Sequence, residues 1–332
     1  LQAVFDSNEI KKEFTHTCIH FPAPGKIPGH YVRASKLYSH LLYNKVKDKL
    51  DAFDFVYIQG FVGDEFYKRK NEFKAKLGVN FHGFEMFQKQ ANLKSTLQSK
   101  LLKKTVISHV QTADYAFSLG GKLTNIIHSL GVEKNNIIDI PNAIDSDWLE
   151  NNIEEDTSSK RLDILFVGRY ERRKGIEELT EAIQEIVKTE EHIFFNFVGP
   201  IPTENQVNHQ QVVYHGKIMD VDKIKSIYQN NDVLISPSYS EGMPTVILEA
   251  MSQNCAILAT DVGANQLMVK SETGWILKSS KPQDLVESIK AVASLDKKSL
   301  SNKKAASREL VKNHFQWKNV IDKTINFIES VQ

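Results

Sequence analysis

The sequence predicts an α/β protein made of two doubly wound, Rossmann-like domains, each built on a parallel sheet. First, short β-rich runs alternate with amphipathic helical runs along the chain, as βαβ units require. Second, this alternation forms two series, separated by a polar stretch at 142–161 that we interpret as a connector. Third, the length of 332 residues exceeds the usual size of a single domain.

The first series predicts an N-terminal domain at residues 1–150. Its strands are expected at 14–21, 53–60, 78–83, 114–119 and 136–141. Its helices are expected at roughly 31–50, 64–76, 91–110 and 121–130.

The second series predicts a C-terminal domain at residues 151–315, followed by a last helix at 316–332. Its strands are expected at 162–168, 192–199, 212–216, 232–237, 256–260 and 274–278. Its helices are expected at 175–189, 221–230, 244–253, 283–294 and 296–314. Pro282 suits the start of one of them, because the first turn of a helix does not need the N–H that proline lacks.

Composition excludes several classes of protein. The net charge of +1 gives no support to a nucleic-acid partner. Cys18 and Cys255 imply no disulfide framework, and no signal peptide or membrane-spanning run is present. We therefore expect a cytoplasmic protein, with a peripheral position on the inner face of the membrane as an alternative. No metal site is expected, and there is no Walker A or G-x-G-x-x-G pattern.

The loops after the strands of the second series carry the chemistry, because ligands of doubly wound folds bind at the carboxyl ends of strands. Gly168 is followed by Arg169 and Lys174, and the run "LISPSYSEGMP" ends in a loop with Glu241 and Gly242. Charged and glycine-containing loops thus share one edge of the predicted sheet.

A helix expected to start near Pro244 predicts a phosphate site at this edge. The N–H groups of a first helical turn have no partners within the helix and attract anions. Gly242 and Met243 would present backbone just before that turn. Arg169 could hold a phosphate in a bidentate manner, and Lys174 could add a point charge.

Two glutamates flank this expected phosphate site. Glu249 lies roughly 7.5 Å along the helix from Pro244, a distance that suits the hydroxyls of a ribose. Glu241 precedes the helix and would reach the opposite side of the phosphates. Together they describe a nucleotide sugar. The alternative is that Glu249 faces water on an amphipathic helix and that Arg169 and Lys174 belong to a solvated charged turn.

These residues match a known family. The chain resembles the retaining glycosyltransferases of family 4, which have the GT-B fold, two doubly wound Rossmann-like domains facing across a cleft. The resemblance covers nearly the whole chain and is most specific in the E-x7-E motif from Glu241 to Glu249. Further support comes from "FVGRYERRKGIEEL", "YHGKI" and the closing "HFQWKNVIDKTINFIESV", a helix that packs back onto the N-terminal domain in that family.

The resemblance implies roles for the C-terminal residues. Arg169 and Lys174 would bind the donor diphosphate, with Thr245 near it. Glu241 would be catalytic and would hold the donor sugar. The remaining contacts would come from residues that present mainly backbone: Gly242, Met243 and Pro244 to the sugar, and Gly216, Lys217 and Ile218 to the base, while Glu249 would take the ribose.

In the N-terminal domain, "VNFHGFE" resembles the H-G-x-E strand end of the family, so His82 would be catalytic and face the anomeric carbon across the cleft. The implied reaction transfers a sugar with retained configuration, without metal or cofactor, from a UDP- or GDP-type donor. The acceptor would be a glycan, lipid-linked or other glycoconjugate in surface polysaccharide or glycoconjugate biosynthesis. The alternatives are a GT-B sugar-nucleotide epimerase and a non-catalytic two-domain sugar-binding protein.

Two features depart from the family pattern. Its first strand and glycine-rich loop are not recognisable, so we expect the N-terminal domain to lack its first strand in this sequence. In addition, Ala143 in "IPNAID" occupies a position where the family usually has glycine. If that backbone needs a positive φ, alanine would resist it.

A further pattern lies in "NLKSTLQSKLLKKTV", residues 92–106, where apolar residues recur at helical spacing among lysines. The apolar residues are Leu93, Leu97, Leu101 and Val106, and the lysines are Lys94, Lys100, Lys103 and Lys104. Such a helix either docks on an anionic membrane that holds a lipid-linked acceptor, or packs on its own sheet with the lysines in water.

Overall fold

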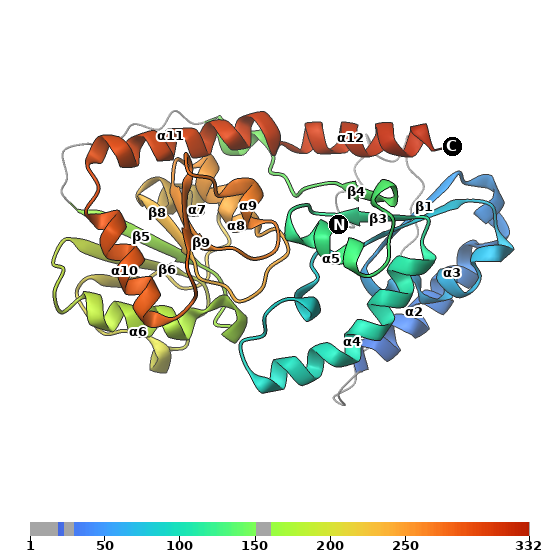
Figure 1. Cartoon of the computed structure of the whole chain (residues 1–332), viewed down its shortest axis with the longest axis horizontal. Helices are drawn as coiled ribbons and strands as arrows, with labels where there is room; N and C mark the ends of the chain where they lie inside the picture. Colours follow the sequence, from blue (N-terminus) through green and yellow to red (C-terminus); the bar gives the residue numbers. More distant parts are fainter. Residues whose placement is uncertain (1–18, 23–29, 151–160, 332) are drawn as a thin grey trace.

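The computed structural model describes residues 19–22, 30–150 and 161–331, which form two α/β domains (Figure 1). In the first domain, four parallel strands pair in the order β1-β2-β3-β4. They are β1 (Phe55–Gln59), β2 (Lys76–Asn80), β3 (Tyr115–Ser118) and β4 (Ile137–Asp139). The helices are α2 (His30–Val46), α3 (Asp64–Lys68), α4 (Leu93–Thr112) and α5 (Lys122–Ser129). The 3-10 turns are η2 (Lys47–Ala52), η3 (Gly60–Gly63), η4 (Lys70–Glu72), η5 (Glu85–Phe87) and η6 (Lys134–Asn136).

The second domain contains a six-stranded parallel sheet in the order β10-β9-β8-β5-β6-β7. Its strands are β5 (Leu162–Val167), β6 (Ile193–Val198), β7 (Val212–Tyr214), β8 (Val233–Ser236), β9 (Ala256–Thr260) and β10 (Gly274–Leu277). Its helices are α6 (Ile176–Ile186), α7 (Val221–Gln229), α8 (Thr245–Ser252), α9 (Asn265–Met268), α10 (Pro282–Ala293) and α11 (Lys297–His314). The 3-10 turns are η7 (Ser146–Leu149), η8 (Arg172–Lys174) and η9 (Thr203–Asn205).

The strand order of the second sheet places its ligand edge. The chain builds outward from β5 through β6 to β7, then returns to pair β8 with the other side of β5 and continues to β9 and β10. This is the doubly wound order, in which ligands bind where the direction of building reverses. The reversal falls between β5 and β8, so the loops after Val167 and Ser236 flank that point.

The predicted strands and helices of the second domain correspond closely to the observed ones, and the short helix α9 is an addition. The first domain differs in three places. The helix expected at 64–76 ends at Lys68, because Phe73 and Ala75 are buried and the chain then joins the sheet at Lys76. The strand expected at 78–83 is β2, shifted toward the N-terminus.

The strand expected at 14–21 is not seen in the part of it that is described: residues 19–21 lie outside any strand. Residues 14–18, and with them Cys18, lie outside the described residues. So do residues 151–160 of the expected connector.

The last helix, α12 (Trp317–Ser330), packs on the first domain although it follows the second (Figure 1). Phe327 makes ring contacts with Phe55, Tyr115 and Phe117 of the first sheet. Where α12 begins, the backbone of Ile144 accepts a hydrogen bond from the N–H of Trp317 at 3.1 Å and donates one to the carbonyl of Phe315 at 2.9 Å. The chain therefore crosses between the domains twice, and the two crossings are bonded to each other.

Ala143 occupies this crossing and is buried. Among the described residues other than glycine, a positive φ occurs at Asn254 alone. Alanine at position 143 therefore imposes no backbone strain.

Candidate functional site

The centre of the candidate site is the carboxylate of Glu241, which follows β8 and is only 4% exposed. A buried carboxylate is costly unless it is paired and hydrogen-bonded. Lys174 donates to Oε1 at 2.6 Å, the Ser238 hydroxyl donates to the same oxygen at 2.8 Å, and Nη1 of Arg173 donates to Oε2 at 3.1 Å. Three donors from the loops after β5 and β8 thus hold the predicted catalytic acid in place.

The three consecutive basic residues of η8 have different partners. Arg173 and Lys174 contact Glu241, whereas Arg172 contacts Glu178 of α6, with 2.6 Å between Nη1 and Oε2. Lys174 was predicted from the sequence as a site residue, and Arg173 was not. The order of three adjacent basic residues does not show which side chain points toward the strand edge, because the direction of each side chain depends on how the turn is folded.

Arg169 pairs with Glu171 and not with Glu241. Its side chain is 70% exposed, and its Nη2 is 2.8 Å from Oε1 of Glu171. Exposed ion pairs of this kind are weak, so the guanidinium is available to an anion that approaches the loop. Its assignment to the donor diphosphate stays a prediction.

The loop between Glu241 and α8 is held by one backbone contact and one side-chain contact from the first domain. Gly242 lies so close to the loop after β2 that a Cβ placed on it would come within 2.0 Å of the carbonyl oxygen of His82. Only glycine permits this approach. On the adjacent residue, the amide of Asn142 donates to the carbonyl oxygen of Met243 at 2.7 Å. Asn142 is a contact that the sequence analysis did not name.

The backbone of His82 therefore lies beside Gly242, while its role at the anomeric carbon stays a prediction. Its ring is exposed, and its Nε2 is 2.9 Å from Oε1 of Gln59, at the end of β1. A second residue of this domain, Gln88, donates from Nε2 to the carbonyl oxygen of Glu241 at 2.5 Å. The structure thus brings together His82, Gln88 and Glu241, although more than 150 residues separate the last two in the sequence.

Pro244 precedes α8 as its N-terminal cap residue, and no side chain caps the first turn. The first N–H groups of this helix are consequently left without a side-chain acceptor, which is the property that favours an anion. Thr245, the first residue of the helix, is exposed.

Glu249 lies on α8 and does not simply point to water. The buried phenol of Tyr228 donates to its Oε2 at 2.8 Å. Burial raises the pKa of the Glu249 carboxyl, while hydrogen bonds from Tyr228 and Thr245 act in the opposite direction. With four lone-pair sites and few donors, this carboxylate retains capacity to accept hydrogen bonds.

The loops after β5, β6 and β7 meet at glycines. A Cβ on Gly199 would lie 1.9 Å from the carbonyl oxygen of Gly168, and the N–H of Gly199 donates to the carbonyl of Gly216 at 2.8 Å. The result is a surface of bare backbone beside the strand reversal. Gly216 and Lys217 are exposed there, and Ile218 packs against the core. Their prediction as base contacts is not tested by this geometry.

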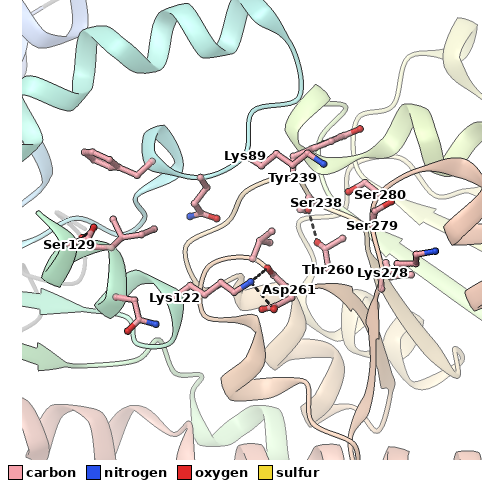
Figure 2. Close-up of a pocket in the computed structure, with 16 residues that line it drawn as sticks. Lys89, Lys122, Ser129, Ser238, Tyr239, Thr260, Asp261, Lys278, Ser279 and Ser280 are labelled. Carbon is pink, nitrogen blue, oxygen red and sulfur yellow. Dashed lines mark hydrogen bonds and ion pairs between the residues drawn. The ribbon is translucent and has the colours of Figure 1, made fainter.

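A cavity of about 650 Å³ lies between the domains (Figure 2). Its walls include Lys89 and Lys122 from the first domain and Tyr239 and Asp261 from the second. Nζ of Lys122 lies 2.7 Å from Oδ2 of Asp261 and joins the two walls. Ser238 lines this cavity and also donates to Glu241, so the cavity adjoins the candidate site.

In residues 19–22, 30–150 and 161–331, His, Cys, Asp and Glu side chains form no group of three that could hold a metal ion. Within the same ranges, no helix combines the length and apolarity that a membrane crossing requires.

Residues 161–294, from just before β5 to the end of α10, match the family model described as "Glycosyl transferases group 1". The putative teichuronic acid biosynthesis glycosyltransferase TuaC of Bacillus subtilis (strain 168) is 31% identical over 125 residues, 38% of this chain and 31% of that protein. The chain thus spans about a third of the length of this relative. These matches support a group 1 glycosyltransferase domain in the C-terminal part of the chain.

Two solved structures resemble nearly the whole chain. Sucrose-phosphate synthase from Thermosynechococcus elongatus has a TM-score of 0.72 and 17% identity, covering 92% of this chain and 78% of its own. HepE of Anabaena, in complex with UDP and glucose, has a TM-score of 0.67 and 14% identity, covering 89% of this chain and 84% of its own. At such identities the likeness shows the fold alone, and it confirms the predicted GT-B fold.

Proposed function

We propose that the chain is a retaining, metal-independent glycosyltransferase that moves a sugar from a nucleoside-diphosphate sugar to a glycan, lipid-linked or other glycoconjugate acceptor. The observation that carries the proposal is the buried carboxylate of Glu241, fixed by Lys174, Arg173 and Ser238 at the strand reversal. The group 1 glycosyltransferase match over residues 161–294 supports it, and so does the name of TuaC, which suggests polysaccharide biosynthesis.

The diphosphate of the donor is assigned to the start of α8. The uncapped first turn offers N–H groups, and Lys174 offers a charge. An ammonium group has three donors, so Lys174 can keep its bond to Glu241 and still reach a phosphate oxygen. Arg169, in the loop after β5, and Thr245, at the start of α8, are exposed and are proposed to complete the phosphate contacts.

The donor sugar is assigned to the space between Glu241 and His82, against the backbone of Gly242, Met243 and Pro244. Leaving-group departure creates negative charge on the diphosphate and positive charge at the anomeric carbon. Lys174 and the helix start stabilise the first. The departing phosphate accepts the acceptor proton on the same face, which retains the configuration without a separate base.

The nucleoside is assigned to the glycine surface beside the strand reversal. Glu249 accepts the ribose hydroxyls with the lone pairs that Tyr228 leaves free, and the backbone of Gly216, Lys217 and Ile218 contacts the base. Because backbone would contact the base, UDP and GDP are both candidates. UDP is also the nucleotide bound in the HepE structure named above.

The test is a panel of UDP, GDP, ADP and their sugars, assayed by thermal shift and by release of nucleoside diphosphate. A nucleotide that binds only the folded chain stabilises it by about 2.7 kcal/mol at a hundred times its dissociation constant. We expect one nucleotide to raise the unfolding midpoint and its sugar conjugate to be consumed. A chain that binds free sugars but neither binds nor cleaves any nucleotide sugar would contradict the proposal.

A further inference from the structure

Helix α4 carries three leucines that do not face its own domain. Leu93, Leu97 and Leu101 are 88%, 67% and 57% exposed, whereas Val106 and Val110 are buried. At about 100° per residue, the three leucines form a face about 80° wide, and the buried valines lie on the opposite side. The helix packs on its domain through one apolar face and presents a second one to solvent.

Lysines surround the exposed leucines. Lys94, Lys100 and Lys104 are exposed, and at the same helical spacing they fall within about 20° of the leucine face. Helix α4 contains no Asp or Glu. The face is therefore apolar with a purely positive border, a pattern that fits a surface with an apolar interior and anionic groups above it.

The position of this face relates it to the candidate site. Figure 1 shows the first turns of α4 at the outer edge of the molecule, near the place where the domains meet. Gln88, which bonds the backbone of Glu241, precedes the first residue of α4 by five positions. A surface bound to Leu93 would therefore lie five residues from Gln88, whose side chain contacts the Glu241 loop.

We propose that the leucine–lysine face, defined by Leu93, Leu97 and Leu101 with Lys94, Lys100 and Lys104, docks on the surface of an anionic lipid bilayer. The leucines enter the boundary between headgroups and acyl chains, and the lysines contact the lipid phosphates. A second copy of the chain is a poorer occupant, because a two-fold contact through this face would bring like charges together. The docking stands apart from the proposed activity; only delivery of a lipid-linked acceptor rests on that function.

The test is co-sedimentation of the full chain with vesicles of phosphatidylcholine alone or of equal parts phosphatidylcholine and phosphatidylglycerol. We expect binding to the anionic vesicles that weakens as salt is added. The combined change Leu93→Gln, Leu97→Gln and Leu101→Gln should weaken binding more than tenfold. Lys94→Glu, Lys100→Glu and Lys104→Glu should do the same, since each basic residue near such a surface contributes roughly fivefold.

Helix α12 provides a matched control, because Ile321 and Ile325 are also exposed apolar residues four positions apart. Ile321→Gln with Ile325→Gln should leave vesicle binding unchanged. All the altered side chains are exposed, so the variants should unfold at the midpoint of the parent. Anionic vesicles that fail to bind the parent, or that bind both α4 variants as they bind the parent, overturn the proposal. So does a parent that is a dimer in light scattering and becomes a monomer with the leucine changes without having bound lipid.

Discussion

The two domains contribute different kinds of groups at the place where they touch. The C-terminal domain brings Glu241 with the charges of Arg173 and Lys174, all from loops at a strand reversal. The N-terminal domain meets them with the carbonyl of His82 and the amide of Gln88. Its described sheet runs β1-β2-β3-β4 without a reversal. Two similar parallel sheets thus contribute different groups to the site. The C-terminal domain holds charged side chains in position, and the N-terminal domain packs against them with backbone and amide groups.

The largest effect expected on this division follows from Glu241→Gln. The amide keeps the size of the side chain but removes the negative charge that we place beside the donor sugar. Turnover should fall by about 10²–10³-fold, the scale seen when one electrostatic group is removed from an active site. Nucleoside diphosphate release measures the rate, and calorimetry measures nucleotide binding, which should change little. A variant as active as the parent would remove Glu241 from the chemistry.

The next test breaks the contact between the domains. In Gly242→Ala, the new Cβ would meet the His82 carbonyl, so the domains must separate slightly. Turnover should fall about tenfold to a hundredfold, because small displacements of reacting groups are costly. The cost in folding free energy should be roughly 1–3 kcal/mol, typical of overpacking.

Gly60→Ala is the control for that variant. Gly60 has a positive φ, which Gly242 does not, but a Cβ there would meet nothing within 4 Å. It should lose only about 1 kcal/mol, the cost of the left-handed backbone, and keep its turnover. Equal loss of turnover in both variants would mean that the contact with His82 does not decide the result, since Gly60 makes no such contact.

A third test concerns the second acid of the C-terminal domain. Glu249→Gln keeps the bond from Tyr228 but removes the charge proposed to accept the ribose hydroxyls. Nucleotide binding should weaken about tenfold, since hydrogen bonds to charged groups contribute about 1.5–3 kcal/mol. The rate at saturating donor should stay close to that of the parent. If the variant instead lost turnover at saturating donor and bound nucleotide normally, the roles assigned to Glu241 and Glu249 would have to be exchanged.

The same variant gives a prediction for stability against pH. Burial raises the pKa of Glu249 above its ordinary 4.5, so the ionised carboxylate at neutral pH lowers the free energy of unfolding. Glu249→Gln should therefore be more stable than the parent at pH 7, by on the order of 1 kcal/mol. As pH falls through the raised pKa and then below 4.5, the parent takes up the proton and the difference should close. Thermal midpoints of both proteins across this range provide the measurement, and a difference that widens toward acid would contradict it.

The smallest effect is expected from Lys122→Ala, which removes the ion pair between the domains at the cavity. Both members of the Lys122–Asp261 pair are partly exposed, with 46% and 29% of the side chain accessible. Such pairs contribute at most about 1 kcal/mol, so the unfolding midpoint should move little. A large drop would show that charge, and not the close approach at Gly242, holds the domains together.

Periodicity predicted the C-terminal domain well because the strands β8 and β9 at its centre are fully buried and most of its helices are amphipathic. Strand β9 begins and ends at the predicted residues 256 and 260. The first domain was harder. Between Lys68 and Lys76 the local sequence favours a helix, but the burial of Phe73 and Ala75 in the domain prevents one. This is a tertiary effect that a local sequence pattern does not predict.

The candidate site was predictable where a motif fixed the spacing, and not where the partner lay in another part of the chain. The pairing of Lys174 with Glu241 unites two loops that the strand-end rule had already placed on one edge. The contacts of Gln88 and Asn142 depend on how the two domains meet. The role of Arg173, and the outward direction of Leu93, depend on the rotation of a turn and of a helix, which the order of residues does not specify.

The double crossing at Ile144 and Gln316 has a consequence for the durability of the molecule. Because the polypeptide links its halves at two separate points, a single cut at either crossing leaves them tethered by the other. A nicked molecule should therefore stay together in gel filtration and come apart only in denaturant. The second tether also keeps the halves at a high effective concentration, so that re-association after opening carries only a small entropic penalty.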